Sequence, residues 1–416
     1  MARAKKPAEK HCRLCGSPLT HSFVDLGATP LANSYVTSEQ LSRGGERSYP
    51  LHARVCEACL LVQVDETLPP DAVFPADYAY FSSVSSSWVA HARRYAEAMI
   101  ERFALGPQAS VMEVASNDGY LLRHFRDRGV PVLGIEPAAN VAAAARAIGV
   151  PTEEAFFSAD TAPEIVARHG QADLVAANNV LAHVPDLVGF IAGFENVLKP
   201  EGVATFEFPH LVNMIRQAQF DTIYHEHYSY LSLLVVERVL ARAGLRAFDA
   251  EQLPTHGGSL RLYACHDAAS HAPLARLQAI RAIEAEAGLH DLAAYDSMAP
   301  KVDAIVGEFI DFVADIHGQG RRLAAYGAAA KGNTFLNACG LTAADIVCVA
   351  DRCAAKQGRF LPGSHVPVVT PEALAAAHPD DVLILPWNIA AEIAVELHPL
   401  CTGSRLWVAM PTLRTI

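Results

Sequence analysis

Residues 110–136, SVMEVASNDGYLLRHFRDRGVPVLGIE, decide how the central part of this chain is expected to fold. The segments VMEV and VPVLGI read as short buried strands. Between them, LLRHFRDR places apolar residues at helical spacing and stops at Gly129, a residue that often ends helices. A strand, a helix and a second strand in this order predict a parallel βαβ unit.

The same rhythm continues beyond this unit. Helices are expected over residues 140–149 and 184–199, and strands over residues 172–181 and 202–209. The alternation predicts a doubly wound parallel sheet, in which ligands bind beyond the carboxyl ends of the strands. A further helix and a closing antiparallel strand pair complete the unit, and we place them at residues 234–245, 246–252 and 258–266.

Three regions follow from these patterns, and they make the fold class α/β. Residues 1–75 form an N-terminal module, and residues 76–270 hold the doubly wound sheet. Residues 271–416 begin with Ala-rich helical segments and then repeat the strand–turn–helix pattern at RRLAAYGAAAKGNTFLNACG. We therefore expect a smaller Rossmann-like α/β domain at the C-terminal end.

The N-terminal module carries two CxxC pairs, in HCRLCGSPL and RVCEACLLVQ, and few large apolar residues. Four thiolates on one structural Zn²⁺ would supply the stability that so small a core lacks. The pairs are 40 residues apart, so a loop must intervene. Disulfides are the competing explanation. The predicted zinc ligands are Cys12, Cys15, Cys56 and Cys59.

Composition excludes several classes of function. The chain of 416 residues has a formal net charge of −12, which argues against a nucleic-acid-binding protein. No apolar run approaches the roughly 20 residues that a membrane-spanning helix needs. The N-terminal segment MARAKKPAEK lacks the apolar region of a secretory signal, so we expect a cytoplasmic protein. Its oligomeric state is not predicted.

The first turn of the doubly wound sheet is not the GxGxxG of dinucleotide-binding proteins. It reads EVASNDG, and Glu136 ends the next strand, where an acid can bind ribose hydroxyls. These residues resemble a class I S-adenosylmethionine-dependent methyltransferase, although that class usually has glycine at the place of Ala115. The resemblance implies a cofactor site made by Glu113, Ala115, Asn117, Gly119, Glu136, Phe157 (beside Phe156), Asn178 and Asn179.

The segment YHEHYSY, residues 224–230, concentrates groups that transfer protons. It is not the HExxH motif of zinc hydrolases, because its two histidines are only two residues apart. On an extended chain His225 and His227 share one face, or they alternate with Glu226 and Tyr228. Buried imidazoles and carboxylates are costly unless satisfied, so the cluster indicates a site or a structural polar network.

The four-cysteine module, the SNDG turn, NNVLAHVPD, YHEHYSYLS, HGGSLR and YGAAAKGNT occur in this order over nearly the whole chain. In that order they resemble the deoxysugar C-methyltransferases, which act on nucleotide-linked 4-ketosugars. The resemblance implies that S-adenosylmethionine is the methyl donor and that a TDP-sugar lies between the last two domains. It implies a reaction in deoxysugar biosynthesis that removes a C3 proton before the methyl group is transferred.

Within this resemblance we expect His227 to be the base, with Tyr224 and Glu226 orienting it or binding the sugar. His183 is a second acid or base, or an oxyanion donor, and Tyr78 closes over the sugar, although Tyr80 is an equal choice. The expected substrate contacts are His225, which could equally be structural, His256, Gly258, Lys331 and Asn333.

Two other functions remain open from the sequence. One is an NAD(P)-dependent oxidoreductase on a similar sheet, and the other is a non-catalytic, zinc-organised binding module. The sequence does not indicate which sugar is bound, whether C3 carries an amino or a hydroxyl group, or which carbon is methylated.

Overall fold

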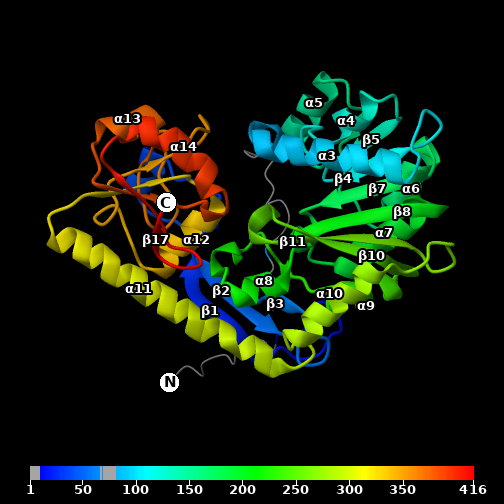
Figure 1. Ribbon diagram of the computed structural model, residues 1–416, viewed down its shortest axis with the longest axis horizontal. Coiled ribbons are helices and arrows are strands. Elements are labelled where there is room, and N and C mark those ends of the chain that lie inside the picture. Colours follow the sequence, from blue (N-terminus) through cyan, green and yellow to red (C-terminus); the bar gives the residue numbers. More distant parts are fainter. Residues whose placement is uncertain (1–9, 66–67, 69–80) are drawn as a thin grey trace.

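The computed structural model describes residues 10–65, 68 and 81–416. Within this part of the chain the strands form three sheets, of four, seven and six strands. The two larger sheets stand side by side with their helices, and the four-stranded sheet lies below them (Figure 1). Tyr78 and Tyr80 lie outside the described residues, so their expected role stays a prediction.

The seven-stranded sheet is the predicted doubly wound sheet, with strand order β10-β11-β8-β7-β4-β5-β6. The neighbouring pairs from β8 to β6 are parallel, whereas β11 is antiparallel to β8 and β10 is antiparallel to β11. The expected closing hairpin is therefore confirmed. The bounds are β4 Val111–Val114, β5 Val132–Ile135, β6 Thr152–Glu153, β7 Ala172–Asn178, β8 Leu198–Pro209, β10 Leu245–Leu253 and β11 Ser259–His266.

Helices cover both faces of this sheet because the strands present apolar side chains on both sides. One face buries Tyr95 and Phe125 of α3 and α4, and the other buries Phe194 and Leu240 of α7 and α9. The helix expected after the SNDG turn is shorter than its pattern suggested and ends where a turn leads to Gly129 at φ +76°. The bounds are α3 Ser86–Arg102, α4 Leu122–Arg126, α5 Ala139–Ala147, α6 Ala162–His169, α7 Leu187–Val197, α9 Leu233–Arg242 and α10 Ala275–Glu286.

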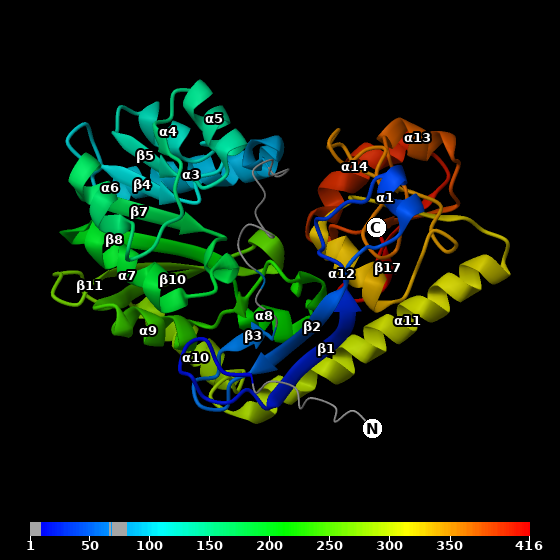
Figure 2. The same cartoon turned by 180° about the vertical axis from the view of Figure 1, so that it is seen from behind.

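The four-stranded sheet joins the N-terminal module to a distant part of the chain. Its order is β1-β2-β3-β9, and all its pairs are antiparallel. Strand β9 directly follows the YHEH segment, and its Tyr230 is opposite Val62 of β3. Figure 2 shows this sheet from behind, beneath both larger units. The bounds are β1 His21–Thr29, α1 Ser38–Arg43, β2 Tyr49–Val55, β3 Val62–Val64 and β9 Ser229–Tyr230.

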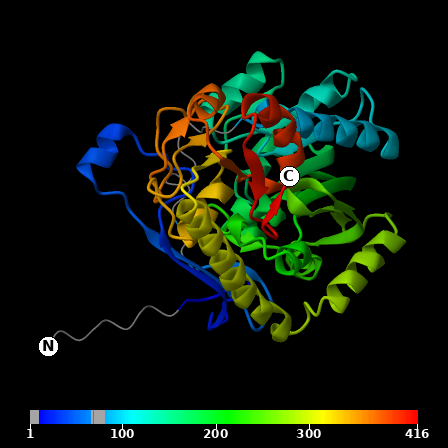
Figure 3. The same ribbon diagram turned by 60° about the vertical axis from the view of Figure 1, so that its left-hand side comes forward.

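The six-stranded sheet forms the predicted second α/β unit, with order β14-β13-β12-β15-β16-β17. All its neighbouring strands are parallel except β17. The long helix α11, Met298–Gly318, leads into it and packs along β1 (Figure 3). The bounds are β12 Leu323–Tyr326, α12 Ala330–Ala338, β13 Val349–Ala350, β14 Val368–Val369, α13 Pro371–Ala376, β15 Asp381–Ile384, α14 Ala390–Leu400, β16 Arg405–Val408 and β17 Arg414–Thr415.

One apolar cluster connects the units. Phe23 of β1, Tyr228 after the YHEH segment, Phe309 of α11 and Leu383 of β15 all belong to it and are about 1% exposed. The segment containing residues 224–230 is therefore held between the N-terminal and C-terminal units. No helix in the described part of the chain is both long and apolar enough to cross a membrane.

Candidate active site

The four expected zinc ligands converge on one point. The Sγ atoms of Cys12, Cys15, Cys56 and Cys59 all lie within 4.8 Å of one another. The Cys12–Cys59 and Cys15–Cys56 pairs are 3.5 and 3.4 Å apart. A tetrahedral zinc with Zn–S bonds of about 2.3 Å needs sulfurs about 3.8 Å apart, so the cluster fits the ion. Buried Gln63 donates from Nε2 to Cys12 Sγ at 3.1 Å and orients that ligand.

The turn after β4 has an unusual backbone. Ala115, Asn117 and Gly119 have φ angles of +56°, +50° and +77°. Left-handed backbone at Ala115 costs roughly 1–2 kcal/mol for a residue with a Cβ atom. This explains why glycine is common at that place in the class I methyltransferases that the sequence resembles. At Gly119 an added Cβ would lie 3.1 Å from Val150, so close packing also favours glycine there.

Two buried carboxylates flank this turn. Glu136 accepts hydrogen bonds from the backbone N–H groups of Asn117 and Ala138, both at 2.9 Å. Each of its oxygens keeps a second lone pair that can accept from a ribose hydroxyl. Glu113 is 1% exposed, and burial raises its pKa well above the ordinary value. The turn therefore presents hydrogen-bond acceptors, and backbone in the left-handed conformation, at the carboxyl edge of the sheet.

The end of β7 reaches the same edge. The Oδ1 atoms of Asn178 and Asn179 are buried and have no hydrogen-bond partner within the described chain, as expected of groups that await a ligand. Asn179 donates from Nδ2 to His256 Nε2 at 3.2 Å, which joins this strand to the HGG turn. Phe157 packs against Phe194 with ring centroids 5.0 Å apart, whereas Phe156 is 55% exposed.

His227 is held as a neutral imidazole with one defined tautomer. Its Nδ1 lies 2.7 Å from the carbonyl oxygen of Thr222, which can only accept, so Nδ1 carries the proton. Its Nε2 therefore carries the lone pair and accepts from the hydroxyl of Tyr224 at 2.8 Å. Burial, the neighbouring His183 and the charge of Lys331 hold the pKa of His227 well below its ordinary value. This ring is a base that stays unprotonated near neutral pH.

His183 and Glu226 lie beside this base. The rings of His183 and His227 are edge to face, with centroids 4.6 Å apart. His183 donates from Nδ1 to the carbonyl of Glu226 at 2.8 Å, and burial lowers its pKa to about 4. Asn33 of the N-terminal module donates to both carboxylate oxygens of Glu226, at 2.8 and 2.7 Å. Burial raises the pKa of that carboxyl to about 7.

The two histidines of YHEH do not share a face. The His225 ring is 1% exposed, and its Nε2 lies 3.2 Å from the carbonyl oxygens of Tyr49 and Pro50. His225 thus anchors the segment to β2, while His227 turns toward Tyr224 and His183. The segment is a turn, closed by the His227 N–H to Tyr224 carbonyl bond at 2.8 Å, and only Ser229–Tyr230 is a strand. Residues two apart share one face only on an extended chain, so that expectation does not apply to this turn.

The other expected substrate residues fall into two places. His256 lies in the 3₁₀ turn η4, Thr255–Gly257, and burial lowers its pKa to about 4. At Gly258, φ is +112° and an added Cβ would lie 2.3 Å from Asn213, so only glycine fits. Lys331 lies at the start of α12 with its ammonium enclosed. Asn333 donates from Nδ2 to the Ala32 carbonyl at 2.5 Å and ties α12 to the N-terminal module.

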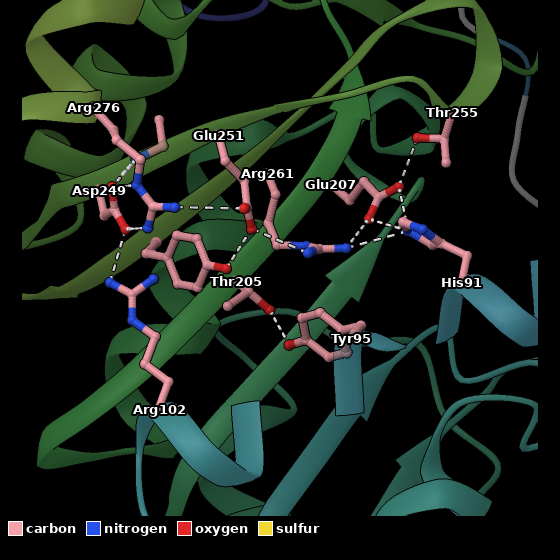
Figure 4. Close-up of polar contacts among 12 residues, drawn as sticks. His91, Tyr95, Arg102, Thr205, Glu207, Asp249, Glu251, Thr255, Arg261 and Arg276 are labelled. Atoms are coloured by element: carbon pink, nitrogen blue, oxygen red, sulfur yellow. Dashed lines mark hydrogen bonds and ion pairs between the residues drawn. The ribbon is translucent and has the colours of Figure 1, made fainter. Parts of the chain in front are cut away.

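A buried polar network supports the HGG turn (Figure 4). Glu207 of β8 is 0% exposed and accepts from Thr255 Oγ1 at 3.0 Å and from Arg261 Nη2 at 2.9 Å. It also lies 3.0 Å from His91 Nε2. Burial opposes the ionisation of Glu207, but His91 and Arg261 hold its pKa below the ordinary value. The network therefore keeps a charged carboxylate at the end of β8, beneath residues 255–256.

Sequence patterns missed several of these groups. The motifs do not include Asn33, Thr222, Glu207 or His91. A cavity of about 20 Å³ lies beside His227 and can hold about one water. The larger cavity, of about 450 Å³, lies near Asp173 and Glu201 at the amino ends of the central strands. It lies at the end of the sheet opposite the carboxyl edge.

Comparisons with known proteins agree with this arrangement. Three family models match in succession: a zinc binding domain over residues 12–74, a methyltransferase domain over residues 88–249 and a C-methyltransferase C-terminal domain over residues 254–411. Ubiquinone biosynthesis O-methyltransferase from Rhodopseudomonas palustris is 25% identical over 156 residues, which cover 32% of this chain and 62% of that protein.

The magnesium protoporphyrin IX methyltransferase ChlM of Synechocystis, solved with bound S-adenosylmethionine, matches at a TM-score of 0.32 and 13% identity, over 43% of this chain and 81% of that one. C-methyltransferase NovU from Streptomyces niveus is 36% identical over 406 residues, which cover 97% of this chain and 96% of that protein. The chain therefore belongs to the C-methyltransferase family and is an S-adenosylmethionine-dependent C-methyltransferase with an N-terminal zinc binding domain.

Proposed function

We propose that this enzyme methylates C3 of a TDP-linked 4-ketodeoxysugar in deoxysugar biosynthesis. The observation that carries the proposal is the neutral His227, whose Nε2 lone pair faces the Tyr224 hydroxyl and whose ring lies against His183. Transfer of a methyl group to carbon needs a base, because the C–H bond must first lose its proton. A ketone at C4 makes the C3 proton removable by spreading the negative charge onto oxygen.

In this mechanism His227 Nε2 takes the C3 proton and leaves an enolate on the sugar. The Thr222 carbonyl keeps the ring in place, because it binds Nδ1–H before and after the transfer. The Tyr224 hydroxyl orients the ring in the free enzyme and leaves Nε2 when the substrate binds. A positioned base contributes roughly 10²–10⁴-fold to the rate.

His183 suits only one of its two expected roles. Its Nδ1 proton is used by the Glu226 carbonyl, so a neutral His183 presents an acceptor at Nε2. We therefore favour a second base over an acid or an oxyanion donor. Glu226, held by Asn33, fixes the backbone between the two imidazoles and remains a candidate for binding a sugar hydroxyl.

S-adenosylmethionine supplies an electrophilic methyl group when bound, and the carboxyl edge of the central sheet fits it. The backbone at residues 115–119 and the Glu136 carboxylate would hold the methionine and ribose parts. Asn178 and Asn179 bring to the same edge Oδ1 atoms that have no hydrogen-bond partner among the described residues. In this proposal Glu113 and Phe157 complete the donor site.

We place the nucleotide-linked sugar between this edge and the C-terminal unit. His256, Gly258 and Lys331 lie on the two sides of that junction, while His225 and Asn333 support its walls through backbone carbonyls. Tyr78 belongs to the same proposal through the sequence resemblance alone.

Mass spectrometry tests this function directly. The purified enzyme, S-adenosylmethionine and a panel of TDP-4-ketosugars should yield one product heavier by a single methylene, with the new methyl on C3. If the enzyme binds S-adenosylhomocysteine but methylates no member of the panel, the proposed substrate class is wrong. Thermal stabilisation by NADH rather than by S-adenosylhomocysteine would instead favour an oxidoreductase.

A further inference from the structure

The ammonium group of Lys331 is enclosed by protein. Its Nζ atom has no hydrogen-bond partner within the described residues and lies 5.3 Å from the centre of the Trp387 ring. Burial lowers the pKa of this lysine, while Asp221 partly offsets the effect. A buried ammonium with three unused donors is expensive unless a ligand satisfies it.

Asp221 is the nearby charge of opposite sign. This carboxylate lies in the 3₁₀ turn η3, Phe220–Thr222, and is 1% exposed. Its Oδ2 accepts from Trp387 Nε1 at 2.7 Å, whereas its Oδ1 is buried without a hydrogen-bond partner in the described chain. The charges of Asp221 and Lys331 therefore interact, yet each side chain keeps a polar atom that has no hydrogen-bond partner among the described residues.

These two groups lie close to the catalytic cluster. Thr222, the neighbour of Asp221, supplies the carbonyl that holds His227 Nδ1 at 2.7 Å. Trp387 packs against the HGG turn so closely that a Cβ added at Gly257 would lie 2.5 Å from its ring. The charge of Lys331 also acts on His227 and His256. The unused donor of Lys331 is thus near the imidazoles of His227 and His256, and Asp221 adjoins the residue that holds His227.

We propose that Lys331 Nζ and Asp221 Oδ1 form a subsite for one hydroxyl group of the sugar ring. The hydroxyl oxygen accepts from the ammonium, and its proton is donated to the carboxylate. Trp387 fixes the geometry, because its ring contacts Lys331 and its N–H holds the other oxygen of Asp221. This inference rests on the proposed function and names the part of the substrate that Lys331 contacts.

A hydroxyl fits this subsite better than a phosphate. A phosphate oxygen would accept from Lys331, but its negative charge would face the buried Asp221 carboxylate and be repelled. A carbonyl oxygen could accept from Lys331 but could not satisfy Asp221 Oδ1. Only a group that both accepts and donates satisfies the two unused atoms together. Sites that read a hydroxyl in this way discriminate strongly against ligands that lack it.

Calorimetry with two probes tests the subsite. TDP carries the nucleotide and diphosphate, and TDP-glucose adds sugar hydroxyls and is not turned over. In Lys331→Met and in Asp221→Asn we expect TDP-glucose to bind about tenfold or more weakly, because a hydrogen bond to a charged group is lost. TDP should bind within about twofold of the wild type. Lys356→Met is the matched control, since that half-buried lysine donates to the Ala328 carbonyl instead.

A double variant, Lys331→Met with Asp221→Leu, removes both buried charges together and should fold even if one single variant does not. It should bind TDP as tightly as the wild type does, and it should bind TDP-glucose no more tightly than TDP. Equal weakening of TDP and TDP-glucose by Lys331→Met would make Lys331 a diphosphate contact and overturn the subsite. Unchanged binding of TDP-glucose in these variants would overturn it as well. If the wild type binds neither probe, the proposed TDP-sugar substrate is itself wrong.

Discussion

Replacing Tyr224 by phenylalanine separates two ways in which Tyr224 and His227 could remove the proton from carbon. In the structure the Tyr224 hydroxyl donates to His227 Nε2, the atom that we propose as the base. This bond must break before Nε2 can take a proton from the sugar. A hydrogen bond of this kind contributes about 0.5–1.5 kcal/mol net. Tyr224→Phe should therefore raise the exchange rate by roughly two- to tenfold if Tyr224 only covers the lone pair.

The ring should stay in place in this variant, because the Thr222 carbonyl still holds Nδ1. His227→Asn removes the base itself and should slow exchange by roughly 10²–10⁴-fold, the usual contribution of a positioned base. The two variants are thus expected to change the rate in opposite directions.

The assay follows loss of the C3 proton signal by NMR in deuterated buffer, with a TDP-4-keto-6-deoxyhexose and S-adenosylhomocysteine in place of the methyl donor. Calorimetric binding of S-adenosylhomocysteine confirms that each variant is folded. A fall of about 10²-fold or more in Tyr224→Phe would show that the phenol oxygen meets the carbon and that His227 only relays its proton. Undiminished exchange in His227→Asn would remove His227 as the base.

Three further predictions follow from burial and charge. In the folded protein the pKa of Glu226 is about 7, against an ordinary value of 4.5. Its contribution to stability is therefore complete below pH 4.5 and is lost as the pH rises through 7. In denaturant titrations, Glu226→Gln should raise the free energy of unfolding by roughly 3 kcal/mol at pH 8 and should give no gain at pH 4. Arg261→Met leaves the buried Glu207 without its cation and should cost about 3–5 kcal/mol by the same measurement, whereas Arg281→Met at an exposed pair should cost under about 1 kcal/mol. Chelation should release one zinc ion per chain, measured by mass spectrometry of the metal, and should lower the melting temperature. The Cys56→Ser variant should fail to retain the ion.

Local pattern was sufficient to predict most of the central and C-terminal folds. The apolar strands β4 and β5 and the stop at Gly129 follow from residues that are adjacent in sequence. The cysteine spacing predicted the zinc ligands for the same reason, because each pair lies on one short turn. The family resemblance supplied the cofactor, since the turn that we propose binds it has left-handed backbone at Ala115 where glycine is usual.

The remaining features depend on contacts between distant segments. Strand β9 has only two residues and pairs with β3, which lies far earlier in the chain. Two residues are too few to show the alternating pattern that predicts a strand. The sequence left open whether the two histidines of YHEH share a face, and their different partners, the carbonyls of Tyr49 and Pro50 for His225 and of Thr222 for His227, show that they do not. The Asp221–Trp387 bond likewise joins two units that only the folded chain brings together.

The pairing of β9 with β3 bears on how such enzymes can be rearranged. Arg13, between the first two cysteines, donates to the carbonyl of Tyr228, and Asn33 holds Glu226. The zinc-binding module thus supports the segment that we propose to be catalytic. A donor-binding core grafted onto a foreign partner without residues 10–65 would keep its cofactor turn but lose the support beneath His227. We therefore expect a chimeric enzyme to stay active only when both pieces come from the same parent.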